Sequence, residues 1–414
     1  MGKRMLMVTP QVVLDRNGTL EIDPHFENNI TGYLTRVDHV TVACTPAKVT
    51  AESWISNSIP IEQCKIADRF NLILLPEGYR EDRYLLNHRR VAKLIEAEID
   101  KADYLTFAPH APFDWPTLAA KIAIRKGRRY DVEADWDMRQ VSTAIWSTMK
   151  PGPNKLRKYV WFQWFFRDLE HIMSKSSLAL LQGADVFNAY RQIAPNPRKV
   201  LNIQVTQDDL IGELDLGRKL KEIRAGEALR IIYTGRATHM KGPLEWLQTL
   251  KRLHDGTYYD SPVKFHATWY GDGDMLDEMR VFVAKHRLGD CVSIPGSVSR
   301  DEVLDAMREA HLFLFCHLTL ESPRCIVEAL ASATAVVGYR TLYTDDLVRE
   351  HGGGEFVPMH CWQELAQSLV NLNNDRERLA ALVEGARATS QHFDRDAAIR
   401  ERIDLIVELL SPGE

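Results

Sequence analysis

The sequence predicts an α/β protein of two domains, each built on a mostly parallel sheet. Short apolar runs of strand length alternate with longer amphipathic segments along most of the chain, which is the pattern of strand–helix–strand units. The pattern is lost once, over the polar residues 206–227, and a second series of apolar runs follows. A length of 414 residues also exceeds what one hydrophobic core ordinarily organises. We therefore expect a linker within residues 206–227.

The expected boundaries follow from this break. Residues 1–205 would form the first domain and residues 206–390 the second, while the amphipathic residues 391–414 could pack back on the first domain as a final helix.

In the first domain, Asn17-Gly18 between apolar residues indicates a hairpin over 14–22, because tight hairpin turns need residues that tolerate positive φ. The other strands are expected where apolar residues cluster, at 4–9, 39–44, 71–75, 103–107, 178–182 and 199–205. Helices are expected where apolar residues recur at helical spacing, at 26–35, 85–99, 116–125 and 155–173.

In the second domain, six strands alternate with helices, as in a Rossmann-like sheet. The expected strands are 229–233, 263–270, 291–294, 311–316, 335–338 and 355–357. The expected helices are 243–253, 274–287, 300–309, 323–332, 362–372, 375–388 and 395–410. Ser299 and Glu302 have the spacing of a capping box at the third of these helices.

Composition excludes several classes of protein. A net charge of −5 and a pI near 6.3 argue against a nucleic-acid partner. Six scattered cysteines without a Cys-x-x-Cys pair indicate reduced thiols. The apolar start is too short for a signal sequence, and no segment is long and apolar enough to cross a bilayer. A cytoplasmic protein is expected, with contact to the inner face of the membrane left open.

Residues 311–339 carry the most informative pattern, which reads as strand, turn, helix and strand. Ser322 is expected to cap the helix, and Pro323 to occupy its first position. The turn follows a strand, where parallel sheets bind ligands, and unpaired amides at a helix start attract phosphates. Glu328 lies among apolar residues of this helix, where a carboxylate without a partner is costly. It is expected to bind hydroxyls; the alternative is a solvated glutamate on the exposed stripe.

Two cations lie together after the strand 229–233. Arg236 follows Gly235 directly, and Lys241 precedes the helix that begins at Pro243. Two cations beside a helix amino end suit a diphosphate whose charge grows as it leaves. The alternative is surface cations paired with nearby acids.

A second turn, Gly271-Asp272-Gly273-Asp274, follows the strand 263–270. Its glycines allow a sharp bend next to a ligand. The two aspartates are also compatible with a manganese site, but the phosphate charge is already matched by Arg236 and Lys241, so no metal is expected.

In the first domain, His110 follows the strand 103–107 and is expected at the edge of the cleft, unless it is only a capping or surface residue. The acidic cluster Glu133, Asp135 and Asp137 is a weaker candidate at a similar strand end. Residues 155–167 combine four cations with six aromatic residues. Because the aromatic residues are not confined to one face, a buried helix is preferred to an interfacial membrane helix.

These motifs in this order resemble the retaining glycosyltransferases of family 4. The resemblance rests on Gly235-Arg236, Lys241-Gly242, Gly271-Asp272-Gly273, Ile294-Pro295-Gly296-Ser297-Val298 and Glu328-Ala329-Leu330-Ala331. It implies the GT-B fold, in which two Rossmann-like domains face each other across a cleft and the C-terminal one holds a nucleotide sugar.

The resemblance also implies roles for single residues. Arg236 and Lys241 would hold the diphosphate, Glu328 the ribose hydroxyls, and His110 would lie near the transferred sugar. Gly235, Gly271 and Gly273, with the turn Glu321-Ser322-Pro323-Arg324, would complete the donor site.

One departure from the family pattern concerns its Glu-x7-Glu motif. Counting back from Glu328 places the first glutamate at Leu320, and Glu321 comes one residue late. Ser322-Pro323-Arg324 also replaces the usual Gly-Phe-Gly-like turn. We expect a rebuilt turn in which Glu321 grips the donor sugar.

The resemblance therefore implies a retaining, metal-independent transferase without a cofactor. Its substrates would be a nucleotide-diphosphate sugar and a sugar or lipid-linked saccharide acceptor, in bacterial polysaccharide or glycolipid biosynthesis. Two alternatives stay open: an inactive family member that binds an active transferase, and another GT-B enzyme such as a nucleotide-sugar epimerase.

Overall fold

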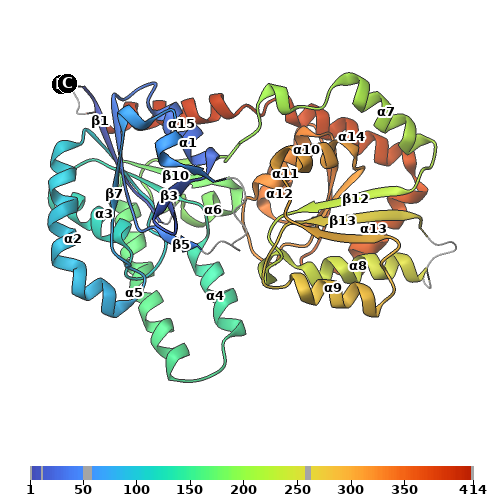
Figure 1. Cartoon of the computed structure of the whole chain (residues 1–414), viewed down its shortest axis with the longest axis horizontal. Coiled ribbons are helices and arrows are strands. Elements are labelled where there is room, and N and C mark those ends of the chain that lie inside the picture. Colours follow the sequence, from blue (N-terminus) through green and yellow to red (C-terminus); the bar gives the residue numbers. More distant parts are fainter. Residues whose placement is uncertain (1, 11–12, 50–57, 257–262, 412–414) are drawn as a thin grey trace. The chain divides into compact units, whose positions relative to one another are not determined.

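A computed structural model describes residues 2–10, 13–49, 58–256 and 263–411 (Figure 1). The chain divides into two compact units, residues 1–202 with 396–414, and residues 203–395. Within the described ranges, no helix combines the length and apolarity needed to span a bilayer.

The first unit is built on a seven-stranded sheet in the order β11-β10-β9-β8-β1-β4-β7, in which all neighbouring strands are parallel. Its strands are β1 (Arg4–Val8), β4 (His39–Cys44), β7 (Phe70–Leu74), β8 (Tyr104–Phe107), β9 (Asp131–Ala134), β10 (Leu178–Gln182) and β11 (Pro197–Val200). Its helices are α1 (Pro24–Tyr33), α2 (Glu81–Lys101), α3 (Trp115–Arg125), α4 (Met138–Thr148), α5 (Pro153–Lys175), α6 (Gly183–Tyr190) and α15 (Arg395–Leu410). Short 3-10 turns occur at Ile61–Gln63 and Ala67–Arg69.

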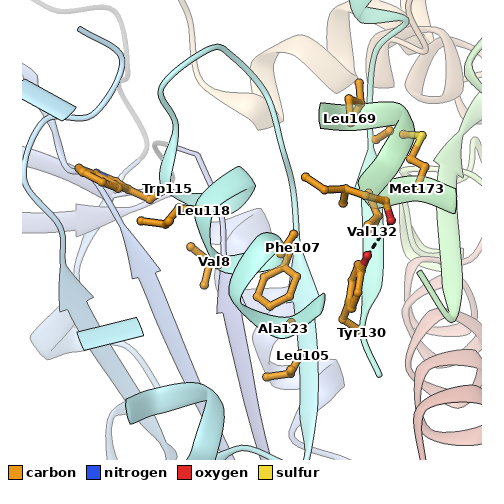
Figure 2. Packing of buried hydrophobic residues seen from close by; sticks show 14 of the residues in the cluster. Val8, Leu105, Phe107, Trp115, Leu118, Ala123, Tyr130, Val132, Leu169 and Met173 are labelled. Carbon is orange, nitrogen blue, oxygen red and sulfur yellow. Dashed lines mark hydrogen bonds between the residues drawn. The ribbon is translucent and has the colours of Figure 1, made fainter. Parts of the chain in front are cut away.

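Successive residues of a strand point to opposite sides of the sheet. In this sheet the residues on both sides are apolar, so both faces are covered by helices. Leu6 and Val8 of β1 lie in one hydrophobic core, with residues of α2, α3 and α5. Figure 2 shows this core, in which the hydroxyl of Tyr130 donates to the carbonyl oxygen of Ile172 at 2.7 Å. Met5 and Met7 lie in the other core, with residues of α1 and of α15. The last helix is therefore part of the first unit.

The expected hairpin is confirmed: β2 (Val13–Arg16) and β3 (Thr19–Ile22) pair antiparallel. Asn17 and Gly18 take φ values of 53° and 93° in its turn. Two short strands, β5 (Ala47–Val49) and β6 (Ile59–Pro60), complete a small four-stranded sheet.

The second unit is built on a six-stranded parallel sheet in the order β14-β13-β12-β15-β16-β17. Its strands are β12 (Leu229–Thr234), β13 (Phe265–Tyr270), β14 (Val292–Gly296), β15 (Leu312–Phe315), β16 (Ala335–Tyr339) and β17 (Gly354–Val357). Its helices are α7 (Glu213–Arg224), α8 (Pro243–Asp255), α9 (Leu276–Lys285), α10 (Arg300–Glu309), α11 (Arg324–Ala331), α12 (Leu342–Leu347), α13 (Trp362–Asn374) and α14 (Arg376–Ser390). Short 3-10 turns occur at Gln207–Asp209 and His239–Lys241, and the capping box of Ser299 and Glu302 at α10 is confirmed.

The expectation of a linker over 206–227 was wrong, because this stretch contains α7. The helix buries Leu216, Lys219 and Ile223, which have the spacing of one helix face. Because one of these three buried residues is a lysine, the sequence does not show the apolar periodicity that predicts a helix. The ammonium of Lys219 donates to the carbonyl oxygens of Ser332 at 2.8 Å and Ala333 at 3.0 Å. The lysine thus satisfies carbonyls at the end of α11 that would otherwise lie buried without donors.

Other differences are smaller. The strand expected at 199–205 lies at Pro197–Val200, and α4, α6 and α12 were not anticipated. The preference for a buried helix over 155–167 was wrong for its first half, because residues 156–160 are exposed, and right for Phe165 and Phe166, which are buried.

Candidate functional site

In the second unit, the candidate residues gather where the strand order reverses. Strands β13 and β14 lie on one side of β12, and β15, β16 and β17 lie on the other. In such sheets the loops after the two strands at the reversal diverge and leave a ligand site at their carboxyl ends. Arg236 and Lys241 follow β12, and Glu321 follows β15, so these three candidates belong to the two loops at the reversal.

The turns after β12 and β13 are held together by their backbones. The amide of Ala237 donates to the carbonyl oxygen of Asp272, and that of Met275 donates to the carbonyl oxygen of Ala237, both at 2.9 Å. Glycine is required here: a Cβ on Gly271 would lie 2.1 Å from the carbonyl oxygen of Gly235, and one on Gly273 would lie 2.4 Å from that of Ala237. These glycines therefore bring the two turns into contact.

Lys241 and Glu321 form a buried ion pair, with 2.7 Å between the ammonium and one carboxylate oxygen. Lys241 ends the 3-10 turn His239–Lys241, and the αL residue Gly242 leads into α8. The other oxygen of Glu321 lies 3.3 Å from Nδ1 of His317 and 3.4 Å from the hydroxyl of Thr319. Both carboxylate oxygens are thus engaged.

His317 extends this pair into a buried network. Its Nε2 lies 2.7 Å from the hydroxyl of Tyr233. Burial lowers the pKa of His317 well below its usual range, and Lys241 acts in the same direction. A neutral ring protonated on Nδ1 donates to Glu321 and accepts from Tyr233, which satisfies both contacts. Neither His317 nor Tyr233 was anticipated as a site residue, although Tyr233 ends one predicted strand and His317 directly follows another.

Arg236 borders this network, since its charge acts on Tyr233, whereas the charged groups that act on Glu328 are Arg324, Arg300 and Asp209. The side chain of Arg236 is exposed beside the network. Glu328 lies with Arg324 and Cys325 on the stripe of α11 that is not fully buried. Burial raises the pKa of Glu328, while Arg324 and Arg300 favour its charged form. Glu328 is therefore neither freely solvated nor part of the core.

The start of α11 differs from the prediction. The helix begins at Arg324, and Pro323 is its N-cap residue, with no side-chain hydrogen bond to the cap. The expectation that Ser322 caps the helix and that Pro323 is its first residue was therefore wrong. Proline at the cap restricts the preceding Ser322 to extended backbone, so the helix cannot start earlier.

In the first unit, a pocket of about 260 Å³ lies at the corresponding reversal, between β1 and β8. It is lined by residues after β1, β8 and β9, among them His110 and Trp136, and by Arg402 of α15. The rings of His110 and Trp136 meet edge to face at 5.4 Å. The buried carboxylate of Asp114 accepts from the amide of His110 at 2.6 Å and so holds this loop.

Of the expected acidic cluster, Glu133 and Asp135 line the pocket, whereas Asp137 caps α4. Burial raises the pKa of Glu133, and Arg402 opposes the shift. No pattern in the sequence indicated Arg402, because an amphipathic helix predicts packing rather than a contribution to a pocket.

Within the described ranges, no group of three or more histidine, cysteine, aspartate or glutamate residues is placed to hold a metal ion. The side chain of Asp272, one of the two aspartates considered for manganese, accepts from the amide of Gly273 at 2.7 Å.

Comparison with known proteins finds a partial match, which lies within the second unit. Residues 219–389 match the family model of glycosyl transferases group 1. A curated relative, the amylovoran biosynthesis glycosyltransferase AmsK of Erwinia amylovora, is 26% identical over 193 residues, which cover 44% of this chain and 46% of that protein. The matched part is thus less than half of the relative's length.

Solved structures resemble the whole chain in fold. HepE of Anabaena, solved in complex with UDP, has a TM-score of 0.68 at 15% identity, covering 98% of this chain and 99% of its own. Sucrose-phosphate synthase from Thermosynechococcus elongatus has a TM-score of 0.69 at 12% identity, covering 99% of this chain and 100% of its own. The predicted α/β fold class, with two parallel sheets of the GT-B type, is confirmed.

Proposed function

We propose that this protein is a retaining, metal-independent glycosyltransferase. It transfers a sugar from a nucleotide-diphosphate sugar to a sugar or lipid-linked saccharide acceptor in bacterial polysaccharide or glycolipid biosynthesis. The proposal applies to the whole chain, whereas the family match covers residues 219–389.

One observation carries the proposal: Lys241, a largely buried cation, lies with Arg236 in the loop after β12, at the reversal of a doubly wound sheet. A buried ammonium needs an anionic partner. In the free protein that partner is Glu321. A diphosphate could take over part of this role, with Arg236 adding a second cation from the exposed side.

The matched region supports a nucleotide-sugar donor. Residues 219–389 contain the loops after β12, β13 and β15, together with Glu321 and Glu328. HepE, which shares the fold, was solved with UDP and also with UDP and glucose. Glu328 would bind the ribose hydroxyls, because a half-buried carboxylate accepts charge-assisted hydrogen bonds.

Retention without an evident nucleophile implies attack on the face that the diphosphate leaves. The leaving phosphate would take the acceptor's proton, while Arg236 and Lys241 stabilise the charge that develops on it. Removing one such donor typically costs about 2.7–4 kcal/mol of transition-state stabilisation.

The pocket of the first unit is proposed to hold the acceptor. It combines the aromatic edge of Trp136 with His110 and the carboxyl groups of Glu133 and Asp135. Aromatic surface and hydrogen-bonding groups together suit a sugar ring, which has apolar C–H faces and polar hydroxyls. The similarity to an amylovoran biosynthesis glycosyltransferase supports a saccharide acceptor.

A thermal-shift panel of nucleoside diphosphates and nucleotide sugars tests the donor site. A ligand at 100 times its dissociation constant should stabilise the protein by about 2.7 kcal/mol. The stabilising nucleotide sugar is then incubated with the protein, and slow hydrolysis or transfer is followed. An α-linked donor that yields an α-linked product supports retention, and the β-anomer contradicts it.

Two alternatives have a specific basis. Leu320 at the expected place of the first family glutamate favours an inactive partner of an active transferase. That reading predicts nucleotide binding without hydrolysis or transfer. A nucleotide-sugar epimerase would instead convert the donor into its epimer, which analysis of the products detects.

A further inference from the structure

A helical hairpin projects from the first unit, and its outer part, away from Met138 at the start of α4, lines neither candidate site. It consists of α4, the connection 149–152 and the amino-terminal half of α5, and Figure 1 shows it extending beyond the sheet and its covering helices. The second half of α5 joins the core through Phe165, Phe166 and Leu169, and α4 joins it at its start through Met138. We refer to residues 149–164 as the hairpin tip.

The tip presents apolar side chains to solvent in a helical stripe. Leu156, Val160 and Trp164 are 66%, 43% and 65% exposed, and a spacing of four residues places them on one face of α5. Tyr159 adjoins this stripe and is 47% exposed. Four large exposed side chains in nine residues form a patch rather than the scattered apolar residues of an ordinary surface.

Aromatic contacts between α4 and α5 hold the hairpin, and with it the patch, in place. Trp146 of α4 contacts the rings of Tyr159 and Phe162 of α5, with centroids 5.2 and 5.5 Å apart. The guanidinium of Arg157 lies over the ring of Trp161 at 4.9 Å. Aromatic packing therefore fixes the two helices against each other while the stripe stays outside.

The segment that carries the patch has charges of a single sign, and the nearest acidic residues of α5, Asp168 and Glu170, are paired with Lys121 and Arg139. Residues 138–167 contain six cationic and no acidic residues, although the whole chain has a net charge of −5. The cations at the tip are Lys150, Lys155, Arg157 and Lys158. Lys155 and Arg157 border the apolar stripe along the helix, where long side chains can reach lipid headgroups while the stripe enters the acyl boundary.

We propose that the hairpin tip docks this protein on an anionic lipid surface. The patch is both cationic and apolar, so its binding partner should offer anionic groups at its surface and apolar material beneath them. A bilayer with acidic headgroups has both properties. The tip lies along that surface rather than spanning it, because no described helix is able to cross a bilayer. This inference goes beyond the proposed function, since docking requires no sugar transfer.

Vesicle flotation with the full chain tests the proposal. Vesicles of phosphatidylcholine with about 30% phosphatidylglycerol should retain the protein, and pure phosphatidylcholine vesicles should retain much less. Raising salt from about 0.1 to 0.5 M should weaken retention, because screening shortens the reach of exposed charges.

Two double variants address the two parts of the patch. Leu156→Ser with Val160→Ser removes apolar surface, and Arg157→Glu with Lys158→Glu reverses two charges. Each should weaken binding to the anionic vesicles by about tenfold or more. All four side chains are exposed, so the fold should persist, and nucleotide thermal shifts on the same samples report on the second unit separately.

Helix α2 offers matched controls in the same unit, with exposed Leu85 and Leu86 and exposed Arg89 and Arg90. Leu85→Ser with Leu86→Ser, and Arg89→Glu with Arg90→Glu, should leave vesicle binding within about twofold of the parent. The proposal is overturned if the parent floats with neither vesicle, if the tip variants bind like the parent, or if the controls lose as much binding as the tip variants. Loss of vesicle binding with intact sugar transfer would leave the proposed function standing.

Discussion

The ammonium of Lys241 and the carboxylate of Glu321 lie 2.7 Å apart, and each side chain is only 10% exposed. The two residues are 80 positions apart in the chain, after neighbouring strands of one sheet. Glu321 is held further by His317, which Tyr233 holds in turn. Glu321, which is expected to bind the donor sugar, is thus the counter-ion of Lys241 in the free protein. Because Lys241 is expected to bind the diphosphate, donor binding and this ion pair should be coupled.

The coupling predicts a stability effect. Lys241→Met should lower the free energy of unfolding by about 3–5 kcal/mol, because the carboxylate of Glu321 is left buried without its cation. Adding Glu321→Gln should recover most of that loss. Urea unfolding of both single variants and the double variant measures the coupling. If the losses of unfolding free energy in the two single variants simply add in the double variant, the two side chains do not act as a pair.

Arg236→Ala should lower turnover by about a hundredfold or more while stability changes by less than about 0.5 kcal/mol. The side chain is exposed, so its removal opens no cavity. The matched control is Arg280→Ala, an exposed arginine of α9 in the same unit. Near-normal turnover in Arg236→Ala would move the diphosphate site elsewhere.

Glu321 and Glu328 should bind different parts of the donor, the sugar and the ribose respectively. Glu328→Ala should weaken binding of the nucleoside diphosphate by about 1.5–3 kcal/mol, because the ribose hydroxyls lose a charged acceptor. Glu321→Gln should bind the nucleoside diphosphate at least as well as the parent, since Lys241 is released, yet lose most transfer activity. Calorimetry and a transfer assay separate the two effects. Transfer by Glu321→Gln at the parent rate would refute the sugar contact.

Activity should survive a chelator, because the charge of the diphosphate is assigned to Arg236 and Lys241. The assay is run with the chelator present and then with added manganese or magnesium. Complete loss that either ion restores would revive a metal role for Asp272 and Asp274.

Stability should fall as the pH drops below about 6.5. Burial lowers the pKa of His311 to about 3, with Arg230, Lys219 and Arg376 acting in the same direction. Between these two values the unfolded chain binds a proton that the folded chain excludes, so the free energy of unfolding decreases by about 1.4 kcal/mol per pH unit for this one group. His311→Leu should flatten the decline when urea unfolding is compared at about pH 7 and pH 4.5. An unchanged slope would assign the acid sensitivity to other groups.

The sequence by itself determined the alternation of elements and several of their ends. Hydrophobic periodicity, the Asn17-Gly18 turn and the capping box of Ser299 and Glu302 depend on neighbours within a few residues, so a local pattern is enough to predict them. The position of candidate residues after strands was likewise local. A parallel sheet gathers the carboxyl ends of its strands at one edge, which is why Arg236, Lys241 and Glu321 could be grouped before their contacts were known.

Only the tertiary structure decided which polar groups meet and which helix faces stay uncovered. The pairing of Lys241 with Glu321, and the entry of Arg402 into the pocket of the first unit, join residues far apart in the chain. Lys219 was assigned to a linker because burial of an ammonium depends on carbonyls supplied by another helix. The tip of α5 was expected to be buried because its aromatic residues occur all around the helix. Which of them are covered depends on where the core ends, and no local pattern records that boundary.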